Sequence, residues 1–353
     1  MRLVFVLPDD RELISGGNLY NRFLLEALGQ SGIVPRAASV RDACRCLNEG
    51  MPAIFLVDSI LLPWLPELAG SRTSAVQKLF IVVHLLPSLD PTQTSEAVVR
   101  EREVLKQIDG FVVTSELAGE LVSRAYPGRP VFAVPPAPVV ISRGRSLPRN
   151  AFRGLMVGNV IEVKGVLALL RSLDALASRD DVFMIEIMGR RDFDPGYADA
   201  CQRLVAASPR LGEKVRFTGP VSPDAMHDVY ERNNVFISAS AMETYGMALH
   251  EARTFGLLVL ALDAGNVPSH VPSERHGRLF ASVPDLARGC LELIRDQAKL
   301  DDLLRSAFEH QLNERYTWHD AAARLLHQIA AWAGLKKAGR SRRHRCPPLT
   351  ASE

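Results

Sequence analysis

The sequence predicts an α/β protein of two doubly wound, Rossmann-like domains, each built on a parallel sheet. Three observations predict this fold class. The chain has 353 residues, more than one typical α/β domain needs. Short apolar runs alternate with longer amphipathic segments, the pattern of a parallel sheet covered on both faces. The alternation stops at a polar stretch rich in turn formers, residues 142–150, and then begins again.

The first domain is predicted over residues 1–145. Strands are expected where apolar residues run without interruption, and helices where apolar residues recur with helical spacing. The expected strands are 2–7, 53–57, 79–83, 110–114 and 131–140. The expected helices are 18–30, 92–108 and 115–125.

The second domain is predicted over residues 151–335, where the same alternation returns. Its last helix could pack back on the first domain. The expected strands are 153–157, 182–188, 215–218, 235–238 and 257–261. The expected helices are 163–176, 195–207, 223–232, 249–255, 285–298, 301–313 and 317–334. The carboxyl ends of the strands in both domains should meet at a central cleft, since open α/β sheets bind ligands there.

Composition excludes several classes of protein. Hydrophobic residues make up 47% and charged residues 23%, which suits ordinary globular cores. The five cysteines are odd in number and irregular in spacing, which argues against a disulfide framework and a zinc site. No signal peptide and no apolar run of roughly 18 residues is visible. We therefore expect a cytoplasmic protein, with peripheral contact at the inner membrane face left open.

The net charge of +2 is unevenly distributed. Residues 336–353 hold six Lys and Arg and one acid, so this tail carries +5 and the remaining chain −3. A dedicated nucleic-acid binder would instead carry its basic residues on a folded face, so no nucleic-acid partner is expected. The tail is predicted to be disordered. It could attract an anionic membrane surface or simply be a solvated end.

Two motifs place glycines at the start of a helix. Ser15–Gly17 follows the first strand, and Val157–Asn159 ends a later strand ahead of Lys164. Glycines let backbone amides approach an anion closely, and a helix N-terminus adds partial positive charge. Both motifs also have a structural explanation, with Ser15 as a helix cap and Lys164 as a solvated side chain.

A third motif pairs two glutamates. Glu243 lies on the loop after an expected strand, and Glu251 lies on the helix that follows Gly246. Carboxylates accept hydrogen bonds only, so the pair suits the hydroxyl groups of a sugar and a ribose. The alternative is one acid near a helix N-terminus and one solvated glutamate.

Taken in order, these motifs resemble the large retaining glycosyltransferase families of GT-B fold, which carry a Glu-x7-Glu signature (family 4, or group 1). The resemblance covers roughly residues 1–335 and is strongest over 155–280. The motifs that carry it are Gly16-Gly17, Val157-Gly158, Lys164-Gly165, Met188-Gly189, Phe217-Thr218-Gly219, Glu243 with Glu251, Asp263–Pro268 and Gly277–Phe280.

The resemblance implies a role for each matching residue. Glu251 would hold the ribose, Glu243 would face the donor sugar, and Lys164 would bind the diphosphate. His84, after an apolar strand, stands where this family often has a histidine near the reacting sugar, or is a structural residue. The implied catalytic residues are Glu243, His84 and Lys164. The implied donor-binding residues are Gly16, Gly17, Gly158, Asn159, Lys164, Gly189, Arg190, Glu243, Thr244, Tyr245, Gly246 and Glu251.

One position departs from the family pattern. The family usually has arginine where this chain has Asn159, and Arg190 or Arg191 could supply the missing charge. The implied function is transfer of a sugar from a nucleotide-diphosphate-sugar to an acceptor, with retention at the anomeric carbon and without metal or other cofactor. Two alternatives remain: a nucleotide-sugar-binding protein of weak or no activity, and a GT-B epimerase acting on the nucleotide sugar.

The acceptor carries no sequence code, and a glycan, a lipid-linked sugar and a small molecule all remain open. The segment 58–70 contains four apolar residues that are expected to be exposed and to touch a lipid or to pack. These residues are Leu61, Leu62, Trp64 and Leu65.

Overall fold

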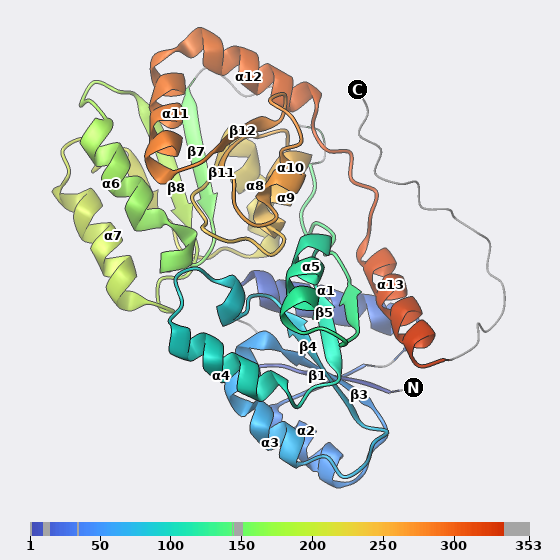
Figure 1. The fold of residues 1–353 in the computed structure, drawn as a ribbon. Coiled ribbons are helices and arrows are strands. Elements are labelled where there is room, and N and C mark those ends of the chain that lie inside the picture. The colour runs from blue at the N-terminus through green and yellow to red at the C-terminus, as the bar shows by residue number, and fades with distance from the viewer. Residues whose placement is uncertain (1, 10–14, 34, 143, 145–150, 335–353) are drawn as a thin grey trace.

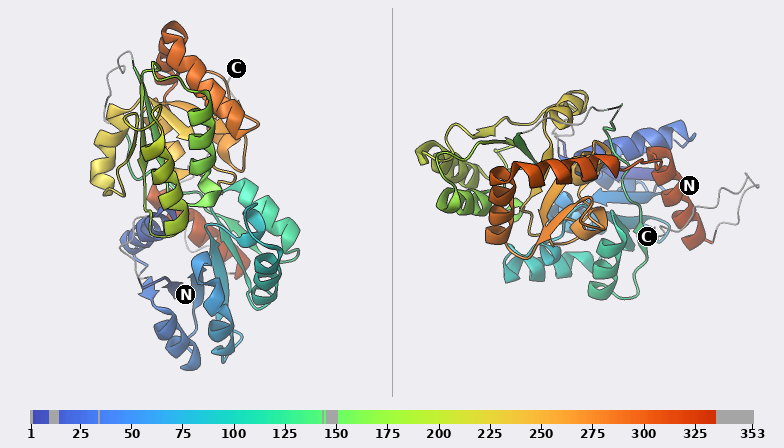
Figure 2. Two further views of the ribbon diagram at one scale, coloured as in Figure 1. Left: turned by 90° about the vertical axis from the view of Figure 1, so that its left-hand side faces the viewer. Right: turned by 90° about the horizontal axis from the view of Figure 1, so that it is seen from above.

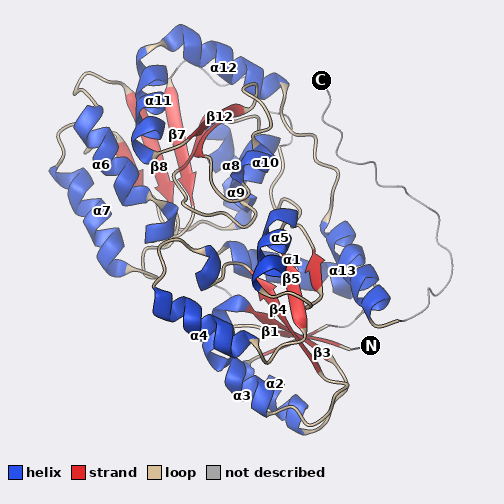
Figure 3. Ribbon diagram, in the orientation of Figure 1, coloured by secondary structure: helices blue, strands red, loops and turns tan. Residues whose placement is uncertain are grey.

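The computed structural model describes residues 2–9, 15–33, 35–142, 144 and 151–334. These residues form two α/β domains, each with a sheet of six parallel strands and helices on both faces (Figures 1 and 3). The fold class predicted from the sequence is thereby confirmed. Most of the expected linker 142–150, and all of the expected tail 336–353, lie outside the described residues.

The first domain has the strand order β2-β1-β3-β4-β5-β6. Its strands are β1 (Leu3–Val6), β2 (Arg36–Ala38), β3 (Ile54–Asp58), β4 (Lys78–Val83), β5 (Gly110–Val113) and β6 (Val131–Ala133). Its helices are α1 (Gly16–Gln30), α2 (Val40–Asn48), α3 (Leu65–Gly70), α4 (Ser95–Leu105) and α5 (Glu116–Ala125), with 3-10 turns η1 (Ser59–Trp64) and η2 (Pro87–Leu89). The chain progresses in opposite directions from β1 and from β3, so the switch point where a ligand can enter lies between these two strands.

Strand β1 shows how the sequence builds two cores on one sheet. Leu3 and Phe5 face the core that α1 and the last helix cover, whereas Val4 and Val6 face the core covered by α2 to α5. Successive side chains of a strand point to opposite faces, so a strand covered on both sides must be apolar throughout. This explains the uninterrupted apolar runs in the sequence.

The second domain has the strand order β12-β11-β10-β7-β8-β9. Its strands are β7 (Phe152–Val157), β8 (Phe183–Met188), β9 (Val215–Phe217), β10 (Val235–Ser238), β11 (Leu258–Leu262) and β12 (Gly277–Phe280). Its helices are α6 (Val166–Leu176), α7 (Pro195–Ala207), α8 (Pro223–Arg232), α9 (Met247–Thr254), α10 (Val267–His270), α11 (Val283–Arg295) and α12 (Gln297–Glu309), with the turn η3 (Glu162–Lys164). The switch point lies between β7 and β10.

The last helix, α13 (Trp318–Trp332), leaves the second domain and packs on the first (Figures 1 and 2). Leu325 and Ile329 are fully buried in the core that they share with α1 and β1. Two side chains of α13, Arg324 and Gln328, donate to the carbonyl oxygen of Ala133 at 2.6 and 2.9 Å. The chain therefore crosses between the domains twice, once before β7 and once before α13.

Shortening a side chain of α13 should weaken the first domain. Ile329→Val removes one buried methylene, and we expect the free energy of unfolding to fall by about 1 kcal/mol. The same change at Ile141, which is 52% exposed, is the matched control and should have almost no effect. Chemical denaturation of both variants measures the difference. Equal stability of both variants would mean that α13 contributes little to the first domain.

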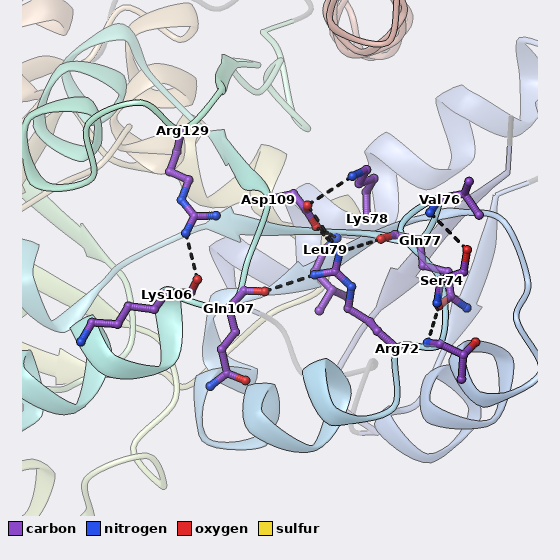
Figure 4. Close-up of polar contacts among 11 residues, drawn as sticks. Arg72, Ser74, Val76, Gln77, Lys78, Leu79, Lys106, Gln107, Asp109 and Arg129 are labelled. Atoms are coloured by element: carbon purple, nitrogen blue, oxygen red, sulfur yellow. Dashed lines mark hydrogen bonds and ion pairs between the residues drawn. The ribbon is translucent and has the colours of Figure 1, made fainter.

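A polar cluster closes the opposite end of the first sheet, where β4 and β5 begin (Figure 4). Asp109 accepts hydrogen bonds from Leu79 N at 2.8 Å and pairs with Arg72 at 3.1 Å and Lys78 at 3.5 Å. Arg72 also donates to the carbonyl oxygen of Gln77 at 2.9 Å. Because these contacts lie at the amino ends of the strands, they stabilise the sheet away from the ligand-binding edge.

The structure corrects the prediction for the apolar segment 58–70. Of the four apolar residues singled out, Leu61, Leu62 and Leu65 are buried in the core beneath α2 to α5, and Trp64 is exposed, at 53%. The four residues were expected to be exposed, with contact to a lipid and packing both left open. The helical segments η1 and α3 turn the three leucines inward, so for them the packing alternative holds. Among the described helices, none is long and apolar enough to cross a bilayer.

Candidate active site

A cleft of about 490 Å³ lies between the two domains. Its walls come from the loops after β1, β3, β4 and β5 on one side and after β7, β8 and β10 on the other. Both switch points therefore open into it, as expected for ligand sites of open α/β sheets. The predicted site residues that line it are Gly16, Gly17, His84, Gly158, Asn159, Lys164, Gly189, Glu243, Thr244, Tyr245, Gly246 and Glu251.

His84 follows β4 and is held by two polar side chains of the first domain. Its Nε2 lies 3.3 Å from Asn21 Oδ1 and 3.5 Å from Asp58 Oδ2. Asn21 in turn donates from Nδ2 to Asp58 at 2.6 Å. Burial lowers the pKa of His84 by more than the Asp58 carboxylate raises it, which favours the neutral imidazole. A neutral imidazole has one nitrogen that donates a hydrogen bond and one that accepts.

Gly17 packs against the ring of His84. A Cβ at position 17 would lie 2.9 Å from His84 Cδ2, so any side chain there would displace the imidazole. The helix α1 begins at Gly16, two residues earlier than predicted, and Ser15 Oγ caps it by accepting from Asn18 N at 3.2 Å. The glycine pair therefore forms the first turn of α1, whose amides have no acceptor within the helix.

Lys164 and Glu243 form an ion pair on the wall of the second domain. Their Nζ and Oε1 atoms lie 2.5 Å apart, and both side chains are partly exposed to the cleft. Gly165 turns the chain after Lys164 with a φ of 66°, and a Cβ there would lie 2.1 Å from the carbonyl oxygen of Ala239. The turn that presents Lys164 thus requires glycine. An anion that enters the cleft would compete with Glu243 for the lysine.

Glu251 is buried on α9 and bonded through both carboxylate oxygens. Oε1 accepts from Val139 N at 3.0 Å, and Oε2 accepts from the Tyr230 hydroxyl at 2.8 Å. Burial raises the pKa of Glu251, and these hydrogen bonds oppose the shift. The backbone of Val140 also contributes a hydrogen bond to this carboxylate, and an ionised carboxylate can accept about four in all, which leaves capacity for a ligand hydroxyl. Glu251 therefore combines a contact to the connection between the domains with capacity for a ligand.

The loop that begins at Glu243 leads into the N-terminus of α9, which points at the cleft. The cap residue Gly246 has a φ of 91° and offers no side chain to the first turn, so those amides are open to an anion. Thr244 Oγ1 donates to the carbonyl oxygen of His84 at 2.7 Å. This hydrogen bond joins the two domains directly across the cleft.

A layer of buried and half-buried side chains supports this loop from behind. The Tyr245 hydroxyl lies 2.9 Å from His250 Nδ1, and His250 Nε2 lies 2.8 Å from Glu314. His270 Nε2 lies 2.7 Å from the carbonyl oxygen of Tyr245. Burial is the main cause that lowers the pKa of His270, from 6.5 to about 3. The histidine is therefore neutral throughout the physiological range.

The pKa of His270 predicts a specific pH dependence of stability. Below pH 6.5 the unfolded chain binds a proton that the folded chain refuses until about pH 3, so stability falls as the pH is lowered through this range. His270→Gln should unfold with the uptake of about one proton fewer than the wild type between pH 6 and 4. Denaturation at several pH values measures it. His319→Gln, at an exposed histidine, should keep the wild-type slope, and an unchanged slope in His270→Gln would contradict the prediction.

One predicted site residue is not brought to the cleft. Arg190 forms an ion pair with Asp192, and its guanidinium lies over the Phe193 ring at 5.3 Å from the centroid. Arg190 is absent from the described cleft lining, and the neighbouring Arg191 is exposed. Among the described lining residues, Lys164 is the only Lys or Arg. The structure gives no sign that either arginine replaces the charge missing at Asn159.

Several residues around the cleft had no sequence signal strong enough to be singled out. Asn21 lies within a helix, and Tyr230 lies on α8, far along the chain from Glu251. Asp58 does have a signal, since it directly follows an apolar strand, as His84 does. Polar residues at that position lie at the ligand-binding edge of the sheet. No group of three or more His, Cys, Asp or Glu suited to a metal ion occurs among the described residues.

The second domain matches a known family. Residues 151–296 fit the model of the family described as glycosyl transferases group 1. The second domain is therefore similar to the group 1 glycosyl transferases. Its matched region contains Lys164, Glu243 and Glu251, the three charged residues of this wall of the cleft.

Curated proteins similar to this chain are glycosyltransferases. The GPI3 subunit of phosphatidylinositol N-acetylglucosaminyltransferase from Saccharomyces cerevisiae is 26% identical over 62% of this chain and 47% of that protein. The D-inositol 3-phosphate glycosyltransferase of Rhodococcus opacus is 27% identical over 67% of this chain and 56% of that protein. The sulfoquinovosyl transferase SQD2 of Arabidopsis thaliana is 28% identical over 41% of this chain and 28% of that protein. The matches thus span about half of these relatives or less.

Solved structures show the same fold. The sucrose-phosphate synthase of Thermosynechococcus elongatus superposes with a TM-score of 0.73 at 16% identity, over 95% of this chain and 100% of that one. The Anabaena protein Alr3699/HepE, in complex with UDP-glucose, superposes with a TM-score of 0.70 at 15% identity, over 94% and 100%. The two-domain architecture around a central cleft is therefore the GT-B fold.

Proposed function

We propose that this chain transfers a sugar from a nucleotide-diphosphate-sugar to an acceptor, with retention of the anomeric configuration. One observation carries the proposal: Lys164, Glu243 and the N-terminus of α9 share one cleft with His84 of the opposite domain. A cation and open amides suit the diphosphate, and the carboxylate suits sugar hydroxyls. The match of the second domain to the group 1 family model and the UDP-glucose in the Anabaena protein support a nucleotide-sugar donor.

The donor would occupy the wall of the second domain. Glu251 accepts hydrogen bonds from the ribose, and the first amides of α9 with Lys164 bind the diphosphate. When the phosphate oxygens draw Lys164 away, Glu243 loses its ion-pair partner and becomes free to accept from the sugar hydroxyls. The amides of Gly16 and Gly17 approach the phosphate from the first domain. Such preorganised donors stabilise charge that develops in the transition state.

The chemical step follows from these positions. The bond between the anomeric carbon and the phosphate oxygen breaks, and its electron pair stays on the leaving diphosphate. The acceptor oxygen forms the new bond on the same face, and its proton passes to the departing phosphate oxygen. The proposal needs no metal ion or other cofactor. The Thr244–His84 contact would help to close the domains over the donor and exclude water.

The acceptor would enter from the first domain, beside His84 and Asp58. A transfer assay identifies the class of acceptor. Glycans, lipid-linked sugars presented on vesicles, and small polyols are each offered together with each donor. The vesicles also test whether the chain makes peripheral contact with a membrane, which the sequence left open. A thermal-shift screen against nucleoside diphosphates selects the base first, since a ligand at 100 times its Kd stabilises by about 2.7 kcal/mol.

NMR of the reaction decides between the proposal and its alternatives. A product with the donor's anomeric configuration supports retaining transfer. An altered donor sugar without any acceptor would identify an epimerase. Tight nucleotide binding with neither transfer nor hydrolysis, across the whole donor and acceptor panel, would identify a binding protein.

Adding the charge that Asn159 lacks should strengthen the site. Asn159 lies on the loop after β7 and lines the cleft near Lys164, so Asn159→Arg can add a cation for the diphosphate. We expect donor affinity or turnover to rise several-fold, within an upper scale of about 1.5–3 kcal/mol for a charged hydrogen bond. Steady-state kinetics measure the change. No gain in Asn159→Arg, together with a loss in Arg190→Ala, would mean that Arg190 already supplies the charge.

A further inference from the structure

Two side chains outside the cleft hold one peptide group of its wall. The carbonyl oxygen of Tyr245 accepts from His270 Nε2 at 2.7 Å and from Asn266 Nδ2 at 3.1 Å. Both donors come from α10 and its cap, and neither residue belongs to the described lining of the cleft. Tyr245 and Gly246, in contrast, do line it. The carbonyl is therefore fixed on the side of the loop that faces the protein interior.

The fixed carbonyl of Tyr245 also sets the direction of the next N–H group, that of Gly246. In a trans peptide the carbonyl and the following N–H point in opposite directions, and the described chain has no cis peptide bond. With the Tyr245 carbonyl directed at α10, the N–H of Gly246 is directed away from α10 and toward the cleft. Asn266 N donates to the carbonyl oxygen of Glu243 at 2.8 Å, which directs the N–H of Thr244 in the same way.

The support itself is rigid. His270 is 8% exposed, and its ring stacks on that of His250 at 5.5 Å between centroids. The buried Arg253 donates from its guanidinium to the carbonyl oxygen of His270. Gly265 allows the α10 loop to approach closely, since a Cβ there would lie 2.4 Å from the carbonyl oxygen of Glu243. Small rearrangements of α10 are thereby opposed on several sides.

We propose that His270 and Asn266 are positioning residues that aim the amides of Thr244 and Gly246 at the diphosphate of the donor. The inference rests on the proposed function and adds residues that touch neither donor nor acceptor. The cleft has little positive charge to bind a diphosphate, because Lys164 is the only Lys or Arg among the described lining residues. Aimed backbone amides can hold an anion without a further cation.

The test compares three histidine variants of the full chain. His270→Leu removes the donor, and His270→Gln retains an N–H near the position of Nε2. His276→Leu is the matched control, because His276 contacts Ser273 and lies outside the described cleft lining. Calorimetry measures the affinity for UDP, GDP and ADP, whichever the wild type binds, and for the corresponding nucleoside. Hydrogen exchange of the peptide 243–249 is measured without ligand.

We expect His270→Leu to weaken binding of the nucleoside diphosphate by about threefold to tenfold, the range for one lost hydrogen bond. Nucleoside affinity should stay unchanged, and exchange in 243–249 should accelerate. His270→Gln should restore most of the diphosphate affinity, and His276→Leu should resemble the wild type. A general structural effect would instead weaken nucleoside and diphosphate equally, which overturns the inference.

The outcomes also separate this inference from the proposed function. If the wild type binds a diphosphate and His270→Leu binds it equally well, the positioning role is wrong and the donor site stands. If the wild type binds none of the three diphosphates, the proposed donor and the proposed role of the two amides are both contradicted. Faster exchange in His270→Leu would then show only that α10 supports the loop.

Discussion

Lys164→Ala should lower the rate of sugar transfer by about 100-fold to 1,000-fold, the scale for loss of one preorganised group that stabilises developing negative charge. Affinity for the nucleoside alone should change little, because the partner of Lys164 is the diphosphate. Steady-state kinetics and calorimetry on the same preparations give both values. Lys214→Ala is the control, since Lys214 donates to the carbonyl oxygens of Ser178 and Arg179 in an exposed turn.

The ion pair with Glu243 offers a second explanation that a double variant can separate. Removing Lys164 leaves Glu243 without its partner at 2.5 Å, and an unpaired carboxylate would repel the diphosphate. If Lys164 acts on the phosphate, Lys164→Ala with Glu243→Gln should be no more active than Lys164→Ala. Recovery of activity in the double variant would show that the lysine mainly neutralises Glu243. Equal loss of nucleoside and diphosphate binding would point to a structural effect.

Glu251→Gln should weaken nucleotide binding by about tenfold to 100-fold, since a hydrogen bond to a charged group contributes about 1.5–3 kcal/mol. We choose glutamine because Glu251→Ala would also leave Val139 N and the Tyr230 hydroxyl without their acceptor. The decisive ligand is a 2′,3′-dideoxynucleotide, which lacks the ribose hydroxyls. Wild type and variant should bind it with equal affinity if the ribose is the partner.

A buried glutamate elsewhere controls for lost stability. Glu101 is 2% exposed on α4, where it accepts from Ser88 N at 2.6 Å and from Tyr126 at 2.5 Å. It lies outside the described cleft lining, so Glu101→Gln should lower the melting temperature without changing nucleotide affinity. Calorimetry that finds unchanged affinity in Glu251→Gln for every nucleotide bound by the wild type would remove the ribose role.

Long periodic segments and strand ends made much of this fold predictable. Pro195–Ala207 and Pro223–Arg232 were predicted with the bounds that the structure shows, because proline marks the first turn and apolar spacing does the rest. The strands β2 and β12 and the helices α2, α3 and α10 were missed. The strands β2 and β12 and the helix α10 have four residues or fewer and depend on neighbours rather than on their own pattern. The nine-residue helix α2 does carry a helical spacing of buried residues, so its pattern was overlooked. The segment 131–140 was predicted as a strand that runs into a proline cluster, and the strand ends at Ala133, since prolines at 135, 136 and 138 cannot donate to a ladder.

Part of the site could be predicted from the sequence, because glycines and charged residues next to strand ends can be recognised there. The site residues from Gly16 to Glu251 were proposed in this way. Two side chains that support them were not visible, Asn21 beside His84 and His270 behind Tyr245, whereas Asp58 directly follows an apolar strand and was overlooked. Their roles depend on contacts between segments that are 37 to 63 residues apart for Asn21, and on a carbonyl group that no sequence pattern reveals.

The double crossing of the chain constrains how the two domains can move. Two domains joined by one covalent connection can rotate relative to each other in any direction, whereas two separate connections restrict their relative motion. The segments before β7 and before α13 are those two connections. A motion that opens the cleft would have to be accommodated by both connections at once. It would also separate Thr244 from His84, whose hydrogen bond spans the cleft.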